Sequence, residues 1–596
     1  GFAIEREGSR FQIGGVPKAL MDVWSSRRAE VLAALQAKGL TSGRAAEIAA
    51  LDTRMQKGEI NRPELFTHWR EQAAEFGFEN EYVADIRAPE PTPAQAMKEP
   101  GQILREAMEQ ASTVSRLQLL HRVVMEAQGA LSAVEAEGYL AQVTGHQDCV
   151  RLIGPKDEPR YTTREMIEIE RRMADQAARL AQNVDHQIDR SVVSRVAESR
   201  TLAPEQLAAI EHVVSRSGAI ACVQGHAGTG KSYMLDAARE ALEAQGYYVR
   251  GAALAGKAAQ GLEESARIKS QTVHSLLAEL ESGQTALDAR TVLVVDEAGM
   301  VGSRQMARII DQVENAGAKL VLVGDSHQLQ PIDAGGAFRA IKDRGGEVEL
   351  TDIRRQHDER DRQVVRDFRD GEASKALESL RSRDRLHTEK TMREAEASAV
   401  KHYLGDVQAG KSSLLLAATR SETRRLNEMA REEAKKRGLV SEKSVVVQTE
   451  RGEREFATGD RVVFLRNSRD LDVKNGTLGH VESAARNGRM CVQLDDGTRR
   501  EFSAAFYSHV DHGYALTVHK AQGVTVDRAH VVAAEMTGRE WSYVAASRAR
   551  EETRLFTTRD LVQEHNLAKS PLARDMAREQ RKDTTLEYQA AQEHSR

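Results

Sequence analysis

Short apolar runs separated by helical stretches recur through the middle of this chain. Residues 219–223, 292–295 and 320–323 consist of Ala, Ile, Cys, Val and Leu, and Gly or Asp follows each run within two residues. Continuous apolar runs of this length predict strands that are buried on both faces, as parallel sheets require. A helical stretch, residues 233–245, follows the first run. The pattern predicts an α/β fold with a parallel sheet.

A second α/β region follows, and a segment with a different period interrupts it. Residues 413–418 form another strand-like run. From 445 to 508, short alternating strands are separated by turns that include Asn475-Gly476 and Asp496-Gly497, which are good hairpin signals. We therefore expect a small β-barrel inserted into the second α/β region, whose pattern resumes at Tyr514.

The N-terminal part of the chain is predicted to be mainly helical. Within residues 17–78, one helix opens at 21–28 and another at the N-cap Asn61. Prolines cluster between residues 89 and 100 in a chain that has 11 in all, which indicates a linker.

The next segment, residues 101–197, is again mainly helical. A candidate hairpin at 150–154 and 160–163 resembles a winged-helix element, and a long helix from 163 to 183 follows it. Contact with DNA or with another domain is one interpretation of this segment, and a packed helical spacer is the other. After Leu567 the chain is polar, and we expect it to be frayed.

Composition narrows the class of protein only a little. The 596 residues include 85 Lys and Arg and 90 Asp and Glu, so the net charge is −5 and the chain as a whole is no basic coat for nucleic acid. A motor needs only a local basic groove, which this balance permits. The three cysteines are scattered and form no CxxC pair, and no apolar run is long enough to span a membrane. A reducing cytoplasm is the expected location.

The clearest chemical signal is a glycine-rich turn between a predicted strand and a predicted helix. Residues 225–232 read GHAGTGKS, which is the GxxxxGK[ST] pattern of a phosphate-binding loop. Its glycines let backbone N–H groups face a phosphate chain at a helix N-terminus, where Lys231 reaches the β- and γ-phosphates and Ser232 ligates Mg²⁺. The predicted nucleotide-binding residues of this loop are Gly225, Gly228, Thr229, Gly230, Lys231 and Ser232.

Acidic and amide side chains follow the later strands. Asp296 ends one strand and is placed to hold Mg²⁺, and Glu297 is placed to orient or deprotonate an attacking water. Gln328 follows another strand and is expected within reach of the γ-phosphate. Gln206 precedes the phosphate-binding loop, and its donor and acceptor suffice to read an adenine edge.

Six motifs occur in a fixed order: GHAGTGKS, VVDEAGM, VGDSHQLQPI, DIRRQ, TVHKAQG and YVAASRAR. In this order they resemble motifs I to VI of superfamily 1 helicases. The TVHKAQG form and the inserted barrel are similar to the RecD-like branch, which moves 5′→3′. The segments GAALAGKAAQGLE, AGGAFRAI and FATGDRVVFLRN resemble the helicase half of TraA-type conjugative relaxases, which are related to TraI and TrwC.

The resemblance implies a fold and a set of domains. The fold is α/β, with two RecA-like P-loop domains, an inserted small SH3-like β-barrel and an N-terminal mainly helical region. The implied domains are a segment joining relaxase to helicase (1–88), a linker (89–100), a helical domain (101–197), RecA-like domain 1A (198–345), the first part of domain 2A (346–444), the SH3-like insertion (445–511), the second part of domain 2A (512–567) and a polar tail (568–596).

The resemblance also implies roles for individual residues. The implied catalytic residues are Lys231, Glu297, Gln328, Arg355 and Arg548, where the two arginines reach across the cleft from the second α/β region. Gln522 and Gly523 join the ATP-binding set, and Ser232 and Asp296 hold Mg²⁺. Small, hydroxyl and basic residues at strand ends are candidates to grip DNA, although turns and caps use the same types. These candidates are Lys257, Thr272, His274, Thr419, Thr517 and His519.

One departure from the family pattern matters. Nicking by a relaxase uses an N-terminal tyrosine and a metal held by clustered histidines, but no HxH cluster is present and no tyrosine precedes Tyr82. The nicking domain is therefore expected to be absent. Implied partners are single-stranded DNA, single-strand/duplex junctions, a relaxase nicking domain and relaxosome or coupling proteins, without membrane insertion. The alternatives are a RecD-like repair helicase, a P-loop nucleotide switch that does not move, and a nuclease, which the missing metal cluster disfavours.

Overall fold

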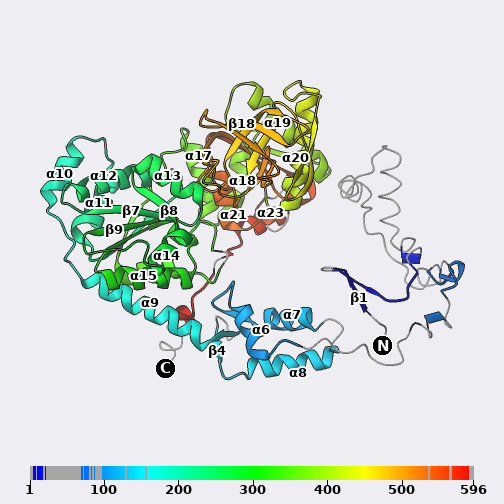
Figure 1. Ribbon diagram of the computed structural model, residues 1–596, viewed down its shortest axis with the longest axis horizontal. Coiled ribbons are helices and arrows are strands. Elements are labelled where there is room, and N and C mark those ends of the chain that lie inside the picture. The colour runs from blue at the N-terminus through cyan, green and yellow to red at the C-terminus, as the bar shows by residue number, and fades with distance from the viewer. Residues whose placement is uncertain are drawn as a thin grey trace. The chain divides into compact units, whose positions relative to one another are not determined.

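The computed structural model shows two compact units (Figure 1). One comprises Gly1–Leu104 with Arg116–Gln147, and the other comprises Arg105–Ser115 with Asp148–Arg596. The structure describes residues 4–7, 10–17, 20–21, 69–71, 73–78, 82–83, 86, 97–127, 131–154, 158–331, 333–534, 537–562, 567–580 and 582–588. The helix openings predicted at 21–28 and Asn61 and the prolines at 89, 91 and 93 fall outside these residues, apart from Met21.

The first unit contains a strand pair and short helices. β1 (Ile4–Glu7) and β2 (Arg10–Ile13) are antiparallel. α7 (Arg116–Glu126) buries Leu119 and Val123 at helical spacing. α8 (Ala133–Thr144) begins at Ser132, whose hydroxyl accepts from the backbone of Glu135 in a capping box. α6 (Pro100–Ala107) spans the boundary between the units.

The second unit begins with a small antiparallel sheet. β3 (Val114–Ser115), β5 (Pro159–Thr163) and β4 (Cys149–Ile153) lie in that order. The predicted hairpin is thus confirmed, with Arg151 opposite Tyr161. Thr163 caps the long helix α9 (Arg164–Gln182), as predicted.

A six-stranded parallel sheet forms the first α/β domain (Figure 1). Its order is β11 (Glu347–Leu350), β6 (Ile220–Gly225), β10 (Lys319–Gly324), β9 (Thr291–Asp296), β7 (Tyr248–Ala253) and β8 (Lys269–Thr272). Alternate residues of each strand face opposite layers: Ile220 and Cys222 join one core, and Ala221 and Val223 join the other. This alternation explains why the central strands β6, β9 and β10 carry continuous apolar runs.

Helices cover both faces of this sheet. One layer contains α9, α14 (Val273–Glu281), α15 (Ser303–Ala316) and α16 (Ala337–Gly345). The other contains α10 (Arg190–Glu198), α11 (Pro204–Glu211), α12 (Lys231–Glu243) and α13 (Gly256–Ala266). α9 and α10, which precede the boundary predicted at residue 198, therefore share the core of this domain.

A second parallel sheet forms the next α/β domain. Its order is β12 (Leu386–Glu389), β23 (Ala549–Thr558), β22 (Val526–Val532), β13 (Ser413–Ala417) and β21 (Ala515–Thr517). One face packs on α17 (Glu359–Arg369), α18 (Ala373–Arg381), α21 (Arg539–Ala546) and α23 (Pro571–Ala577), and the other packs on α19 (Met392–Gln408) and α20 (Arg420–Lys436).

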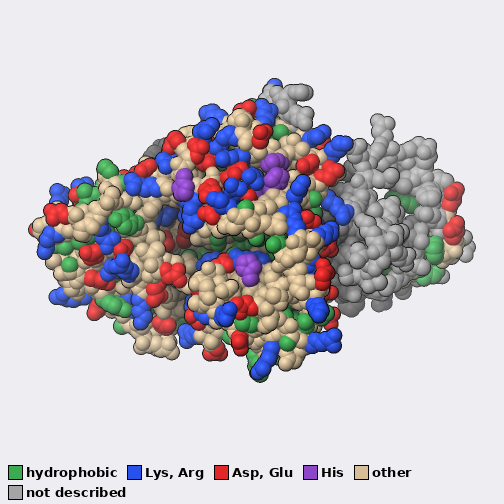
Figure 2. Space-filling view, turned by 90° about the horizontal axis from the view of Figure 1, so that it is seen from above, with side chains coloured by type: hydrophobic (Ala, Val, Ile, Leu, Met, Phe, Trp, Pro, Cys, Tyr) green, Lys and Arg blue, Asp and Glu red, His purple; other side chains and the backbone are tan. Residues whose placement is uncertain are grey.

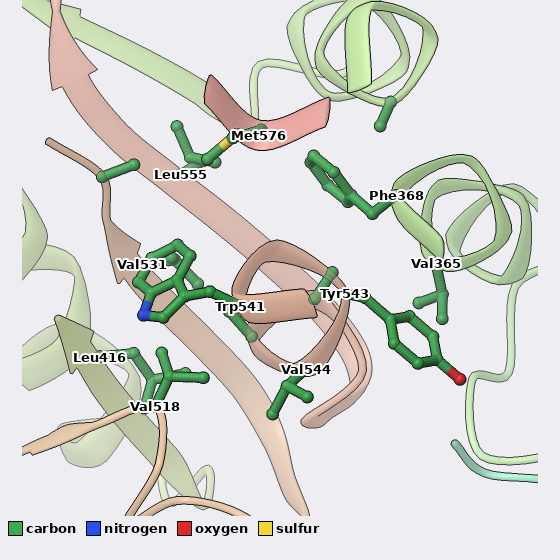
Figure 3. Close-up of a cluster of buried hydrophobic side chains, with 14 of the residues drawn as sticks. Val365, Phe368, Leu416, Val518, Val531, Trp541, Tyr543, Val544, Leu555 and Met576 are labelled. Carbon is green, nitrogen blue, oxygen red and sulfur yellow. The ribbon is translucent and has the colours of Figure 1, made fainter. Parts of the chain in front are cut away.

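The helix α21 lies at the centre of this second domain. Trp541 and Val544 pack against Val531 and Leu416 of the sheet (Figure 3). Tyr543 is fully buried, and its phenol oxygen points away from the apolar cluster (Figure 3).

The C-terminal segment differs from the prediction. Leu572, Ala573 and Met576 of α23 are buried in the core of the second α/β domain. Thr584 and Thr585 are fully buried as well. The expectation of a frayed polar tail was wrong for the described residues, because a few apolar and hydroxyl positions in a polar stretch pack onto segments that are distant in sequence.

Antiparallel strands interrupt the second domain between α20 and β21. β14 (Val445–Thr449) pairs with β15 (Gly452–Phe456). The neighbouring sheet has the order β19 (Arg499–Ser503), β18 (Arg489–Leu494), β17 (Leu478–Ala484), β16 (Arg461–Phe464) and β20 (Val510–His512). Both sheets share one core that includes Phe456 and Phe464. Gly497, with a φ of +85°, lies in the turn between β18 and β19, as predicted. SH3-like closure stays a prediction.

Two further observations concern the described residues. None of their helices combines the length and the apolar character needed to cross a bilayer. The three cysteines are free thiols, and Cys222 is buried within β6.

Candidate nucleotide site

The glycine-rich loop joins β6 to α12 with the geometry that its sequence predicts. Gly228 and Gly230 have φ angles of +84° and +82°, a region that residues with a Cβ rarely adopt. A Cβ on Gly225 would lie 2.5 Å from Cδ of Lys231. The loop therefore requires glycine at these three positions, and it ends at the N-terminus of a 13-residue helix.

The side chain of Lys231 folds back over this loop. Its Nζ atom donates to the carbonyl oxygen of Gly225 at 2.7 Å and lies 3.4 Å from that of His226. The ammonium group is thus held at the start of the loop, and Lys231 lines the cavity described next.

A cavity of about 620 Å³ lies at the loop. Both α/β domains contribute to its lining. The residues predicted for catalysis or nucleotide and Mg²⁺ binding that line it are Gly228, Thr229, Gly230, Lys231, Ser232, Asp296, Glu297, Gln328, Arg355, Gly523 and Arg548. All five predicted catalytic residues are therefore brought together, whereas Gln206, Gly225 and Gln522 do not line the cavity.

Asp296 ends β9 at the carboxyl edge of the first sheet, and Glu297 follows it. Glu297 has a φ of +52°, and its backbone N–H donates to Oδ1 of Asp296 at 2.8 Å. A left-handed conformation is unusual for glutamate, and such conformations cluster at functional sites. Burial, together with the negative charge of Glu297, raises the pKa of the Asp296 carboxyl to about 6. The positive charge of Lys231 opposes this rise only in part.

Asp325 and Gln328 follow the adjacent strand, β10. Asp325 is buried, and its Oδ2 atom accepts from Nε2 of Gln328 at 3.1 Å. Its Oδ1 atom accepts from the backbone N–H of His327 at 3.1 Å. Burial opposes ionisation of Asp325, but hydrogen bonding with His327 and the positive charge of Lys231 bring its pKa below the ordinary value.

Two arginines reach the cavity from the segments around the second domain. Arg355 donates through Nη1 to the carbonyl oxygen of Ser547 at 2.9 Å, and Arg548 donates through Nε to that of Val544 at 2.9 Å. Burial lowers the pKa of both guanidinium groups, to about 9 for Arg355. Within the described residues neither guanidinium has a carboxylate within ion-pair distance, which is the arrangement expected for binding an anionic ligand.

Both ends of the Gln206 side-chain amide make hydrogen bonds to the backbone. Its Oε1 atom accepts from the backbone N–H of Ala203 at 3.1 Å, and its Nε2 atom donates to the carbonyl oxygen of Thr229 at 3.3 Å. The side chain is buried and supports the loop backbone in this structure. Its role in reading a base stays a prediction.

The predicted DNA-binding residues lie near the carboxyl ends of parallel strands. The last residues of β7 and β8, Ala253 and Thr272, are paired in register, as are those of β13 and β21, Ala417 and Thr517. His274, Thr419 and His519 follow these ends and are exposed.

Several of these residues also make local contacts that stabilise the fold. The Oγ1 atom of Thr272 caps α14, and that of Thr419 caps α20. Lys257 lines the nucleotide cavity, and its Nζ atom lies 3.4 Å from the carbonyl oxygen of Gly476 in the antiparallel insertion. Their binding to DNA stays a prediction.

Sequence reasoning missed Tyr543 and Arg550. Tyr543 donates to Oδ2 of Asp325 at 2.7 Å, and Arg550 lines the cavity. Both belong to the YVAASRAR motif, so its density of polar side chains was the available signal.

Three family models match separate parts of the chain. An AAA domain matches residues 201–391, a UvrD-like helicase C-terminal domain matches 512–556, and a TrwC relaxase model matches 1–76. The first two together include all five predicted catalytic residues. The third covers most of the segment 1–88, which was assigned to a connection between relaxase and helicase. The expected absence of the nicking domain stays a prediction.

A conjugal transfer protein TraA from Rhizobium radiobacter is 43% identical over 444 residues, which is 74% of this chain. The chain is a relative of the TraA conjugal transfer proteins. It spans 40% of the length of that relative. The TraA-type resemblance seen in the motifs is confirmed.

Similarity also extends to DNA helicases. The ATP-dependent RecD2 DNA helicase of Deinococcus radiodurans is 28% identical over 359 residues, which is 59% of this chain and 48% of that protein. A Bacteroides Pif1 helicase, solved with ADP-AlF3 and single-stranded DNA, is 18% identical and covers 66% of this chain and 98% of its own, with a TM-score of 0.45.

Proposed function

We propose that this TraA relative is an ATP-dependent DNA helicase that moves 5′→3′ along single-stranded DNA and drives strand transfer in conjugation. One observation carries the proposal: five side chains suited to ATP hydrolysis, from two parallel-sheet domains, line one cavity at a phosphate-binding loop. A site divided between two domains is suited to coupling hydrolysis to domain movement, which a simple nucleotide switch does not need.

Phosphate binding is assigned to the loop and Lys231. The Lys231 ammonium now contacts neutral carbonyl oxygens, the closer at 2.7 Å. Phosphate oxygens are stronger partners for an ammonium group than neutral carbonyls, because both sides of the hydrogen bond are then charged. The N-terminus of α12 adds partial positive charge at the same place.

The donor set fits a magnesium ion. The Ser232 hydroxyl and the Asp296 carboxylate both line the cavity. Burial, together with the negative charge of Glu297, raises the pKa of Asp296, and a bound cation would favour its carboxylate form. Ser232 and Asp296 are the residues that would hold Mg²⁺, which neutralises developing charge on the phosphates when bound. Glu297 is then assigned to orient the attacking water.

Arg355 and Arg548 are assigned to the charge that develops on the γ-phosphate. Arginines of this kind contribute about 10³–10⁵ in rate in related phosphoryl-transfer enzymes. Arg548 belongs to the second domain, and the Arg355 side chain is anchored to the Ser547 carbonyl there. The backbone N–H of Arg355 donates to the carbonyl oxygen of Gly228 in the phosphate-binding loop at 3.1 Å, so Arg355 links the two domains. Hydrolysis would therefore open and close the cleft between the domains.

The carboxyl edges of the two sheets supply the proposed DNA track. Hydroxyl and imidazole groups at 272–274 and 517–519 lie at the strand ends of the first and second sheets. Lys and Arg side chains are interspersed with Asp and Glu on the face shown in Figure 2. Alternate binding by the two domains would move the strand, and the antiparallel insertion would help to separate the duplex.

Direction and biological context rest on the family comparisons. The RecD-like resemblance supports 5′→3′ movement, and the relaxase match at 1–76 supports conjugation over DNA repair. Relaxosome and coupling proteins are the partners expected in that setting.

The first test is ATP hydrolysis by the purified chain with and without a single-stranded oligonucleotide. We expect slow hydrolysis that the oligonucleotide stimulates strongly, and no stimulation by blunt duplex. Absence of hydrolysis in both conditions would contradict the proposal, whereas hydrolysis that ignores DNA would favour a nucleotide switch.

A further inference from the structure

A chain of hydrogen bonds runs beneath the nucleotide cavity. The backbone N–H of Ala227 donates to the Tyr543 hydroxyl at 2.7 Å, and that hydroxyl donates to Oδ2 of Asp325 at 2.7 Å. The same oxygen accepts from Nε2 of Gln328 at 3.1 Å. The Oε1 atom of Gln328 in turn accepts from Nε2 of Gln522 at 3.3 Å.

The direction of the first two bonds is fixed by chemistry. A backbone N–H can only donate and an ionised carboxylate can only accept, so the Tyr543 hydroxyl must receive from Ala227 and give to Asp325. Asp325 holds its ionised form because its pKa lies below the ordinary value despite burial. Each link is therefore an aligned dipole in a buried setting, where hydrogen bonds are stronger than in water.

This chain of hydrogen bonds joins the two α/β domains. Ala227 lies just beyond the end of β6, and Asp325 directly follows β10. These two strands are adjacent and parallel in the first sheet. Tyr543 belongs to α21 in the core of the second domain and is 0% exposed. The apolar neighbours of α21 fix the ring, so the position of the hydroxyl reports the position of the second domain (Figure 3).

We propose that Tyr543 is a positioning residue for ATP hydrolysis, setting Gln328 through Asp325 according to the placement of the second domain. This role rests on the proposed function. Gln328 lines the cavity and is the predicted γ-phosphate contact, but one of its own hydrogen bonds is to the carboxylate that Tyr543 engages. Movement of α21 then changes the partners of Asp325, and with them the orientation of the Gln328 amide.

The chain offers a matched control. Tyr514 is also buried, and its hydroxyl donates to Oδ1 of the buried Asp460 at 2.7 Å. This pair joins the second α/β domain to the antiparallel insertion and does not line the nucleotide cavity. Tyr514→Phe therefore removes the same kind of buried tyrosine–aspartate bond without touching the proposed link to Gln328.

The test compares Tyr543→Phe, Tyr514→Phe and the unaltered chain in DNA-stimulated ATP hydrolysis. For Tyr543→Phe we expect kcat to fall about tenfold, equivalent to roughly 1.4 kcal/mol of transition-state stabilisation, while KM for ATP changes by less than about twofold. Tyr514→Phe should retain kcat. In a Gln328→Ala background the Tyr543→Phe change should have no further effect, because the two residues act in series.

The outcomes separate the proposal from the function on which it rests. If the unaltered chain hydrolyses no ATP, the proposed function fails, and this role fails with it. If the unaltered chain is active and Tyr543→Phe keeps full kcat, the positioning role is overturned. The role is also overturned if Tyr543→Phe lowers kcat by the same factor in the Gln328→Ala background as in the unaltered chain.

Thermal unfolding of each variant checks that it folds. Should Tyr543→Phe not fold, Asp325→Ala removes the acceptor of the Tyr543 hydroxyl from the first domain. A fall in kcat that depends on Gln328 then supports the role, and an unchanged kcat overturns it.

Discussion

The side-chain nitrogen of Lys231 lies 2.7 Å from the carbonyl oxygen of Gly225, so the lysine at the end of the phosphate-binding loop donates a hydrogen bond to the residue at its start. Gly225 must be glycine for this contact, because a Cβ there would collide with the lysine side chain. The Lys231 ammonium group is therefore held at the start of the loop by a carbonyl oxygen of the loop itself.

Replacement of Lys231 by alanine tests this arrangement. We expect Lys231→Ala to lose ATP hydrolysis and to bind ATP at least about tenfold more weakly, because a charge-assisted contact to phosphate is removed. Calorimetric titration with ATP and Mg²⁺ measures the affinity. Retention of both affinity and turnover would exclude Lys231 from phosphate binding.

Replacement of Glu297 by glutamine separates binding from chemistry. Glutamine has nearly the same shape but is not a base, so turnover should fall by about 10²–10⁴ while ATP still binds. The contacts of Lys231 and the Asp296 carboxylate are left in place. Steady-state hydrolysis and titration with ATP, measured on the same preparation, give the comparison, and near-normal turnover would remove Glu297 from its role.

Much of this site was predictable because its chemistry sits at the ends of strands with a strong local signal. Val292 to Val295 form a strand that is buried on both faces, so Asp296 must emerge at its carboxyl edge. The same logic places Gln328 beyond β10. Parallel strands bring such ends to one edge, and the cavity there collects residues more than 300 positions apart.

Other features depend on contacts that no local pattern encodes. The burial of Thr585 needs Glu170, 415 positions away, as its acceptor. Gln206 carries a side chain suited to reading a base, but one end of its amide accepts from the backbone N–H of Ala203 and the other donates to the loop at Thr229. The Tyr543–Asp325 hydrogen bond joins residues 218 positions apart, so the sequence shows both residues but does not show that they are bonded to each other.

Arg548 provides a third test. Its guanidinium is buried without a carboxylate partner in the described part of the chain, and Arg548→Ala should abolish most ATP hydrolysis while much of the DNA binding remains. The exposed Arg151 of β4 supplies a control substitution of the same type. Fluorescence anisotropy with a labelled oligonucleotide measures DNA binding in the absence of nucleotide. A collapse of DNA binding as complete as that of hydrolysis would make Arg548 a DNA contact instead.

A fourth prediction concerns stability. The buried Glu170 accepts from the hydroxyl groups of Ser112 and Ser303 at 2.6 and 2.8 Å, and from the backbone and hydroxyl of Thr585 at 2.6 and 2.7 Å. Glu170→Ala leaves these donors without their acceptor, so we expect a loss of about 2–3 kcal/mol in the free energy of unfolding.

The control for this prediction lies on the same helix. Glu168 of α9 is exposed, and Glu168→Ala should leave the thermal midpoint nearly unchanged. Thermal unfolding followed by circular dichroism compares the two variants. Equal midpoints would show that the carboxylate of Glu170 does not hold the C-terminal segment in place.

Strand separation on tailed duplexes tests the central claim most directly. The substrates are matched duplexes that carry a single-stranded tail on either the 5′ or the 3′ side, incubated with ATP and Mg²⁺ and with Glu297→Gln as the inactive control. We predict that the duplex with the 5′ tail is unwound, and that the duplex with the 3′ tail and the control reaction remain intact. Unwinding from the 3′ tail alone, or equal unwinding with Glu297→Gln, would contradict a 5′→3′ motor driven by this site.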